Sequence, residues 1–288
     1  TASAQQARTA WGDPVIEGIW TFAPDKDVNP VCGDQDVVNG CQEGDKEVFR
    51  QLGLPPERLS WPGSLVRGTP DRQIPYQPWA RAKQLQRKKY RLSANPPGIE
   101  FISTGARCLS YGVPSTVLRP GFHVWQFPTH ILMIWEQPFQ MHRIIWTDGR
   151  APPGADVKLL QGFSVGRWAG NVLRVTTTNS NGFPWMGTVA GDFYSEHVRQ
   201  METFTVLGPN QISYRVEIED PTVYTQPWWM EWHYTVAAPV AATAASAGPI
   251  GKGGLSAGMA TNTSELWEVA CVEGDRSHYI ESVRPRRY

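Results

Sequence analysis

The side chains best suited to chemistry include a carboxylate and an imidazole on either side of a short turn. Glu136 and His142 flank the turn in HILMIWEQPFQMHRIIWTD, and Arg143 follows directly. A carboxylate beside an imidazole fixes its tautomer and raises its basicity, which suits a general base at neutral pH. Across a hairpin, Glu136 can meet either His142 as an acid/base dyad or Arg143 as an ion pair. We expect a dyad, with Arg143 holding developing negative charge; the alternative is a structural ion pair.

Glu231 and His233 form a second candidate pair in PWWMEWHYTV. Alternate residues of a strand point to opposite faces, so these two share one face. The other face carries Trp228, Met230, Trp232 and Tyr234. One face must line the interior, and the sequence leaves open which. An aromatic interior would hold a flat hydrophobic molecule, whereas the other arrangement would place an acid/base pair inside; Glu231 and His233 would otherwise be ordinary surface residues.

Further residues are expected to bind the ligand. They are Trp146, Trp228, Tyr234, His130 and His197. Ser195, Glu196 and His197 are adjacent and would point to alternate faces of a strand, so they cannot form a catalytic triad among themselves. The chain has no Gly-x-Ser-x-Gly nucleophile elbow.

Metal and cofactor motifs are absent from the sequence. The six histidines show neither His-x-His nor His-Glu-x-x-His spacing, which leaves a cluster of His123, His130 and His142 from separate strands as one metal alternative. An EF-hand-like calcium loop at Asp25, Asp27, Asn29 and Asp36 is another, although Pro30 stands where such a loop needs Gly. There is no Gly-x-Gly-x-x-Gly, Walker A or Cys-x-x-Cys-His motif. We therefore expect no cofactor and no metal.

These side chains must be positioned by strands. After residue 98, segments rich in β-branched and aromatic residues follow one another with gaps too short for crossover helices. About eight such strands would leave two bare edges unless the sheet closes. The sequence thus predicts a mainly β protein, an antiparallel up-and-down barrel with a few short helices in the N-terminal third.

The expected organisation is one domain. Residues 1–97 would carry a first strand, a loop-rich segment and a basic helix packed on the barrel formed by residues 98–288, with a flexible loop at 237–262. The helix is predicted in WARAKQLQRKKYRL, which follows Pro78. Its basic residues are expected to form a solvated face, with Trp79, Leu85 and Leu92 packed inward; a polyanion site is the alternative.

Composition excludes several classes of function. With 27 acidic and 27 basic residues, the chain lacks the positive field of a nucleic-acid binder. No apolar run approaches the ~20 residues that cross a bilayer.

Two resemblances support this prediction. Gly18-Ile19-Trp20 resembles the opening of lipocalins and related calycin barrels, many of which only bind their ligands. Seven segments resemble a large uncharacterised family of secreted bacterial proteins: PYQPWARAKQ, RCLSYGVP, WTDGR, FSVGRWAGNVLRVTTTN, SEHVRQMETF, IEDPTVYTQPW and LWEVACVEG. The second resemblance implies fold and export, not chemistry. Val272 follows Cys271 where His is expected, so no His-dependent site is carried over there.

The compartment is expected to be extracytoplasmic. The chain opens with small and polar residues and no Met, as after removal of a signal peptide, which predicts a periplasmic or secreted protein. Cys32 and Cys41 can close a short disulfide loop, and Cys108 can pair with Cys271; four free thiols are the alternative.

The leading hypothesis is a cofactor-independent lyase or isomerase. It would use the acid/base side chains above on an aromatic or terpenoid-like molecule inside the barrel, by elimination, hydration, isomerisation or cyclisation. The alternative is a non-catalytic carrier of a hydrophobic small molecule. Sugar recognition by some of the 13 Trp is a third reading, although most of these lie in strand patterns, where core packing is the default. The sequence does not determine the oligomeric state.

Overall fold

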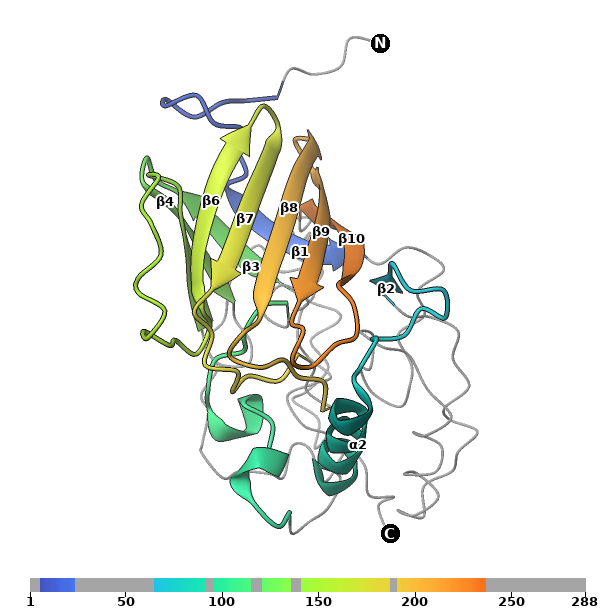
Figure 1. Cartoon of the computed structure of the whole chain (residues 1–288). Coiled ribbons are helices and arrows are strands. Elements are labelled where there is room, and N and C mark those ends of the chain that lie inside the picture. Colours follow the sequence, from blue (N-terminus) through green and yellow to red (C-terminus); the bar gives the residue numbers. More distant parts are fainter. Residues whose placement is uncertain are drawn as a thin grey trace, which may run out of the picture.

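The computed structural model describes residues 6–23, 65–91, 96–114, 121–135, 141–186 and 191–236 (Figure 1). Nine of its strands form a closed barrel. They are β1 (Gly18–Ala23), β3 (Phe122–Gln126), β4 (His130–Trp135), β5 (Met141–Trp146), β6 (Phe163–Ala169), β7 (Val172–Thr178), β8 (Arg199–Gly208), β9 (Gln211–Glu219) and β10 (Trp228–Val236). Closure occurs because β1 pairs with both β3 and β10. The predicted mainly β barrel is confirmed.

One contact in the barrel wall departs from a strict meander. Each strand is antiparallel to its neighbours except β5 and β6, which run parallel and pair only at Ile145–Ser164 and Trp146–Val165. An odd number of strands cannot alternate in direction all the way around a closed barrel, so one parallel contact is required. Residues 147–162 carry the chain back along the outside of the barrel to make it (Figure 1). We call this contact the β5–β6 seam.

Strict alternation of buried and exposed side chains defines the inside of the wall. In β8, β9 and β10 almost every second residue is buried. The face of β10 that points inward is the aromatic one, since Trp228, Trp232 and Tyr234 are almost completely buried. This settles which face of PWWMEWHYTV lines the interior. Large aromatic side chains fill much of the barrel centre.

Short elements surround one end of the barrel (Figure 1). The helix α2 (Pro78–Arg91) lies beyond that end, together with the 3₁₀ turns η2 (Ile99–Phe101) and η3 (Gly105–Arg107). The two-residue strand β2 (Val66–Arg67) adds to the edge of β10 near its start, beside the stretch that pairs with β1. Among the described residues, no helix has the length and apolar character needed to cross a membrane.

The orientation predicted for α2 is wrong. The side chains that the helix buries are Ala80, Gln84, Arg87 and Lys88, whereas Trp79 is 49% exposed. Spacings of three and four residues place the buried set on one helical face. The reason is the close approach of Gly191, whose φ is +73° and where a Cβ would lie 2.8 Å from the Cβ of Arg87. Arg87 and Lys88 are therefore docked, whereas Lys83 and Lys89 are exposed; Leu92 lies outside the described residues.

The opposite end of the barrel is covered by residues 6–17, which we call the plug (Figure 1). The buried side chain of Gln126 on β3 holds it: the Ile16 N–H donates to Gln126 Oε1 at 2.5 Å, and Gln126 Nε2 donates to the Pro14 carbonyl at 3.0 Å. Arg8 Nη2 also donates to Asn171 Oδ1, at the turn between β6 and β7, at 3.3 Å. The plug is thus tied to the wall at β3 and at the turn between β6 and β7.

Candidate functional site

The barrel wall separates His142, the described member of the first predicted dyad, from the neighbouring Arg143. His142 is exposed on the outer face of β5, whereas Arg143 is 3% exposed and points inward. Adjacent strand residues face opposite ways, so only one of the two can reach the interior. Glu136 lies outside the described residues, and its expected contact with His142 stays a prediction.

The second predicted pair also lies on the outer face. Glu231 and His233 are half-buried and alternate with the inward-facing aromatic residues of β10. Their cross-strand neighbours on β9 are Arg215 and Ser213, respectively. The pair therefore does not line the barrel interior.

Two of the predicted ligand-binding residues belong to an outer stack of rings. His130 lies between Phe127 and Trp146, with ring centroids 4.6 Å and 5.3 Å away. The Arg150 guanidinium sits 3.5 Å from the centroid of the Trp146 ring. These side chains pack against one another on the outer face of the barrel. Trp146 therefore does not line the interior, which was the role expected for it.

His197 is likewise exposed, and its contact with the Ser195 hydroxyl is made by its backbone and not by its imidazole ring. Its backbone N–H donates to Ser195 Oγ at 3.1 Å. Ser195 Oγ in turn donates to Asp220 Oδ1 at 3.0 Å, and the Ser195 N–H donates to Asp220 Oδ2 at 2.6 Å. This arrangement shapes the turn before β8.

The metal site considered for the histidines is not formed by the described part of the chain, and the calcium loop considered at residues 25–36 lies outside that part. His123, His130 and His142 all lie on the outer face, and no three metal-ligating side chains come together in the ranges given above. His123 is stacked on Trp125 with centroids 3.6 Å apart, and burial lowers its pKa while Glu17 opposes that shift.

The interior next to the plug contains a small apolar cavity. Its volume is about 10 Å³, which is near the minimum for one water molecule. It is lined by Ile16, Phe122, Val124, Ile131, Met133, Ile145, Leu173, Phe204, Ile212 and Tyr234. Tyr234 contributes its aromatic ring to this lining, which is entirely apolar. The described interior is therefore nearly filled, and a void of this size is what the structure shows where the sequence predicted a chamber for a small molecule.

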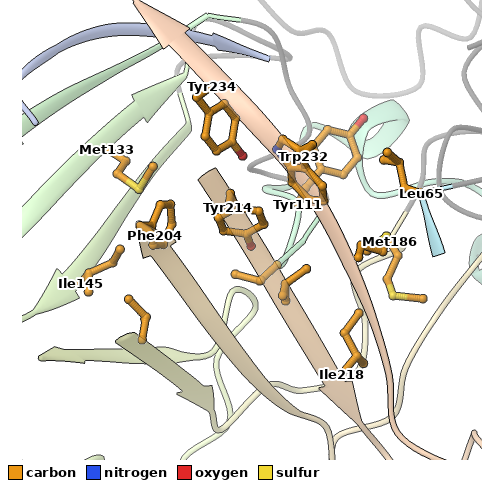
Figure 2. Close-up of a cluster of buried hydrophobic side chains, with 14 of the residues drawn as sticks. Leu65, Tyr111, Met133, Ile145, Met186, Phe204, Tyr214, Ile218, Trp232 and Tyr234 are labelled. Atoms are coloured by element: carbon orange, nitrogen blue, oxygen red, sulfur yellow. The ribbon is translucent and has the colours of Figure 1, made fainter. Parts of the chain in front are cut away.

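Tyr234 lines this cavity, and the ring of Tyr214 packs next to it. Figure 2 shows Tyr214 and Tyr234 between Met133 and Phe204 on one side and Trp232 on the other. The Tyr214 ring lies 4.7 Å from Phe204, 5.7 Å from Tyr234 and 4.5 Å from Trp232, centroid to centroid. Burial raises the pKa of both phenols well above the ordinary value. Both are therefore neutral near pH 7.

A fully buried ion pair lies beside Tyr214. Arg143 Nη1 donates to Glu202 Oε1 at 2.9 Å, and Nη2 donates to Glu202 Oε2. Arg143 also donates to Ser164 Oγ and to Thr177 Oγ1 at 3.0 Å. The Tyr214 hydroxyl donates to Glu202 Oε1 at 2.8 Å. We call these five residues the buried polar network.

The charges in this network compensate one another. Burial by itself would lower the pKa of Arg143, but the charge and hydrogen bonds of Glu202 raise it above the ordinary value. A buried guanidinium without its carboxylate would be costly, so the two groups stabilise each other's charged form. Neither charge is left over to stabilise a charged intermediate, the role expected for Arg143.

Sequence reasoning missed Glu202 and Tyr214. Glu202 shares a strand face with the apolar residues Phe204 and Val206 in RQMETFTVLG, and this face points inward. A charged residue on such a face could have been noticed in the sequence. Its partner Arg143 could not, because that residue belongs to a strand far away in the sequence. The sequence left open whether Trp228 and Tyr234 face the interior, and the structure shows that they do.

The described interior thus combines an apolar cavity beneath the plug with a neutralised polar network beneath the cavity. Such an interior favours apolar groups over polar ones, and at its present size it has room for no more than about one water molecule. A scan of the chain against models of protein families found no match, and searches of curated proteins and of solved structures likewise found none.

Proposed function

We propose that this protein binds a small hydrophobic molecule, aromatic or terpenoid-like, in the plug end of the barrel. The observation that carries the proposal is the entirely apolar lining of this cavity inside a closed barrel wall.

The size of the cavity defines what binding requires. About 10 Å³ does not hold an aromatic ring, so the guest must displace lining side chains. Met133 is suited to this because an unbranched thioether side chain changes rotamer at low cost. Burial of apolar surface then stabilises the complex, at roughly 25 cal/mol per Å².

Binding receives more support than acid/base catalysis. An enzyme of the expected kind needs its acid and base on the inner face. Of the described candidates His142, Glu231, His233 and Arg143, only Arg143 is there, and Glu202 neutralises it. The carrier alternative requires no ionisable group in the cavity.

A matched pair of variants tests the proposal. Leu173→Phe fills the cavity, whereas Leu132→Phe makes the same change on the outer face of β4. Ligand-observed NMR with indole, naphthalene derivatives and monoterpene alcohols should detect binding to the unmodified protein and to Leu132→Phe. Leu173→Phe should weaken it at least about tenfold, since the guest and the new ring compete for one space. Equal binding by both variants, or no binding of any compound in this panel to the unmodified protein, would contradict the proposal.

Product analysis separates the carrier from the enzyme. After incubation, a carrier returns each bound compound unchanged. His142→Gln and His233→Gln should leave binding unaltered because both side chains lie outside the barrel. Turnover that is lost in either variant would favour the acid/base enzyme.

An extracytoplasmic location is part of the same proposal. Three of the four cysteines, Cys32, Cys41 and Cys271, lie outside the described residues, so both expected disulfides stay predictions. Thiol labelling of the denatured, unreduced protein tests them. Four unreactive cysteines support two disulfides and an oxidising compartment, whereas four labelled thiols count against both.

A further inference from the structure

The buried face of α2 contains a cation that no acceptor satisfies. Arg87 is 7% exposed, and its Nε and Nη1 atoms are buried without a hydrogen-bond partner. Gln84, one turn earlier on the same face, accepts a hydrogen bond from Arg81. Buried guanidinium groups are normally paired, so the unmet donors of Arg87 set it apart from its neighbour.

Aromatic rings hold the Arg87 guanidinium in place. It lies 4.6 Å from the centroid of Phe193 and 5.4 Å from that of Trp185. Phe193 is fixed in turn, because the Tyr224 hydroxyl donates to its carbonyl at 2.7 Å. Contact with ring faces offsets part of the cost of burying the charge but leaves the N–H groups along the edge of the guanidinium unbonded.

A second cation reinforces the first. Lys83 Nζ lies 5.1 Å from the Phe193 centroid on the same side of α2, one turn before Arg87. Burial and the neighbouring charge of Arg87 lower the pKa of Lys83. Glu100 is an acid near both groups, but it forms no ion pair with either in the described structure. The charge of Glu100 therefore compensates these two cations only in part, without a direct contact.

We propose that Arg87 and Lys83 bind a small oxyanion, a carboxylate or phosphate group, at the junction of α2 with residues 191–194. The planar fork of a guanidinium matches two oxygens of such a group, and a nearby ammonium adds a third donor. The site lies beyond the end of the barrel opposite the plug (Figure 1), so it is separate from the apolar cavity and does not depend on the proposed function.

Calorimetric titration with inorganic phosphate and, separately, with acetate tests the proposal at constant ionic strength set with chloride. At least one anion should bind saturably to the full-length protein. Arg87→Met removes the charge and keeps the length of the stem, and it should weaken that binding about tenfold or more, as expected for a lost hydrogen bond to a charged group. Phosphate binding without acetate binding identifies a phosphate ligand; the reverse identifies a carboxylate.

Two further variants keep the test decisive. Lys83→Gln changes an exposed residue and should weaken binding about threefold even if Arg87→Met does not fold. Arg174→Gln, an exposed arginine on β7, should leave binding unchanged. The proposal is overturned if neither anion binds saturably, or if Lys83→Gln and Arg174→Gln behave alike.

Discussion

Arg143 on β5 and Glu202 on β8 form an ion pair inside the barrel, with both side chains almost fully removed from solvent. The strands between them are also attached to Arg143, through Ser164 on β6 and Thr177 on β7. The pair therefore spans the β5–β6 seam, where the wall has only two paired residues on each strand. One buried guanidinium links four consecutive strands at the place where backbone pairing is shortest.

Breaking the pair from one side should destabilise the protein strongly. Arg143→Met leaves Glu202 charged and buried, which costs about 3–5 kcal/mol when a buried partner is removed. Urea unfolding followed by Trp fluorescence measures the change. The double variant Arg143→Met/Glu202→Leu should recover much of the loss, because no unpaired charge remains. Arg199→Gln, which removes an exposed ion pair with Glu219, should change the midpoint little.

Enlarging the cavity should lower the free energy of unfolding and strengthen the binding of small aromatic compounds. Phe204→Ala removes a buried ring from the cavity lining and should cost about 3–5 kcal/mol in the free energy of unfolding. The space left behind is apolar and stays dry, so small aromatic compounds should bind it more tightly than they bind the unmodified protein. Thermal shift with and without indole shows both effects. A variant that is destabilised but not rescued by any small aromatic compound would argue against the plug end as the binding site.

The plug should control entry to the cavity. Gln126→Met removes the hydrogen bonds to Ile16 and Pro14 while keeping the side chain's size, so ligand association should become faster. Stopped-flow fluorescence measures the rate. Gln200→Met is the matched control: Gln200 is also a buried glutamine and donates to the Val113 carbonyl nearer the other end of the barrel. Similar acceleration in both variants would indicate general loosening instead of plug movement.

Buried tyrosines should make the protein unstable in alkali. Burial raises the pKa of Tyr76, Tyr214, Tyr224 and Tyr234 well above the ordinary value and that of Tyr194 to about 12. In the unfolded chain these phenols titrate near pH 10. Above that pH the folded state holds more protons than the unfolded state, so stability falls as pH rises.

An absorbance titration of the phenolate band checks this expectation. These five groups should ionise only when the protein unfolds, in one cooperative step. Tyr214→Phe should reduce the amplitude of that step. Gradual ionisation of all nine tyrosines near pH 10, with the fold intact, would contradict the burial of these side chains.

Much of the fold could be predicted from the sequence because the alternation of apolar and polar residues along a strand is a local property. PWWMEWHYTV and RQMETFTVLG show the period of two that strands require, and short gaps between neighbours excluded crossover helices. The same reasoning failed for α2. It assumed that apolar residues pack and basic residues face water, whereas close approach of the helix to Gly191 buried Arg87 and Lys88 instead.

The candidate site was harder to predict than the strands. Alternation showed that Glu231 and His233 share a face, but not that this face is the outer one. It separated His142 from Arg143 without indicating which lies inside. Sequence spacing also gave no sign that Arg143 meets Glu202, because their contact depends on how the barrel closes.

By itself, the order of residues determined that this chain forms strands, that the strands follow one another as a meander, and that the sheet must close to protect its edges. These follow from side-chain alternation and loop length, which act over a few residues. Only the tertiary structure decided which face is the interior, where the parallel seam falls and which charges meet. Those outcomes depend on closing a wall of nine strands, which brings together side chains that no local pattern relates.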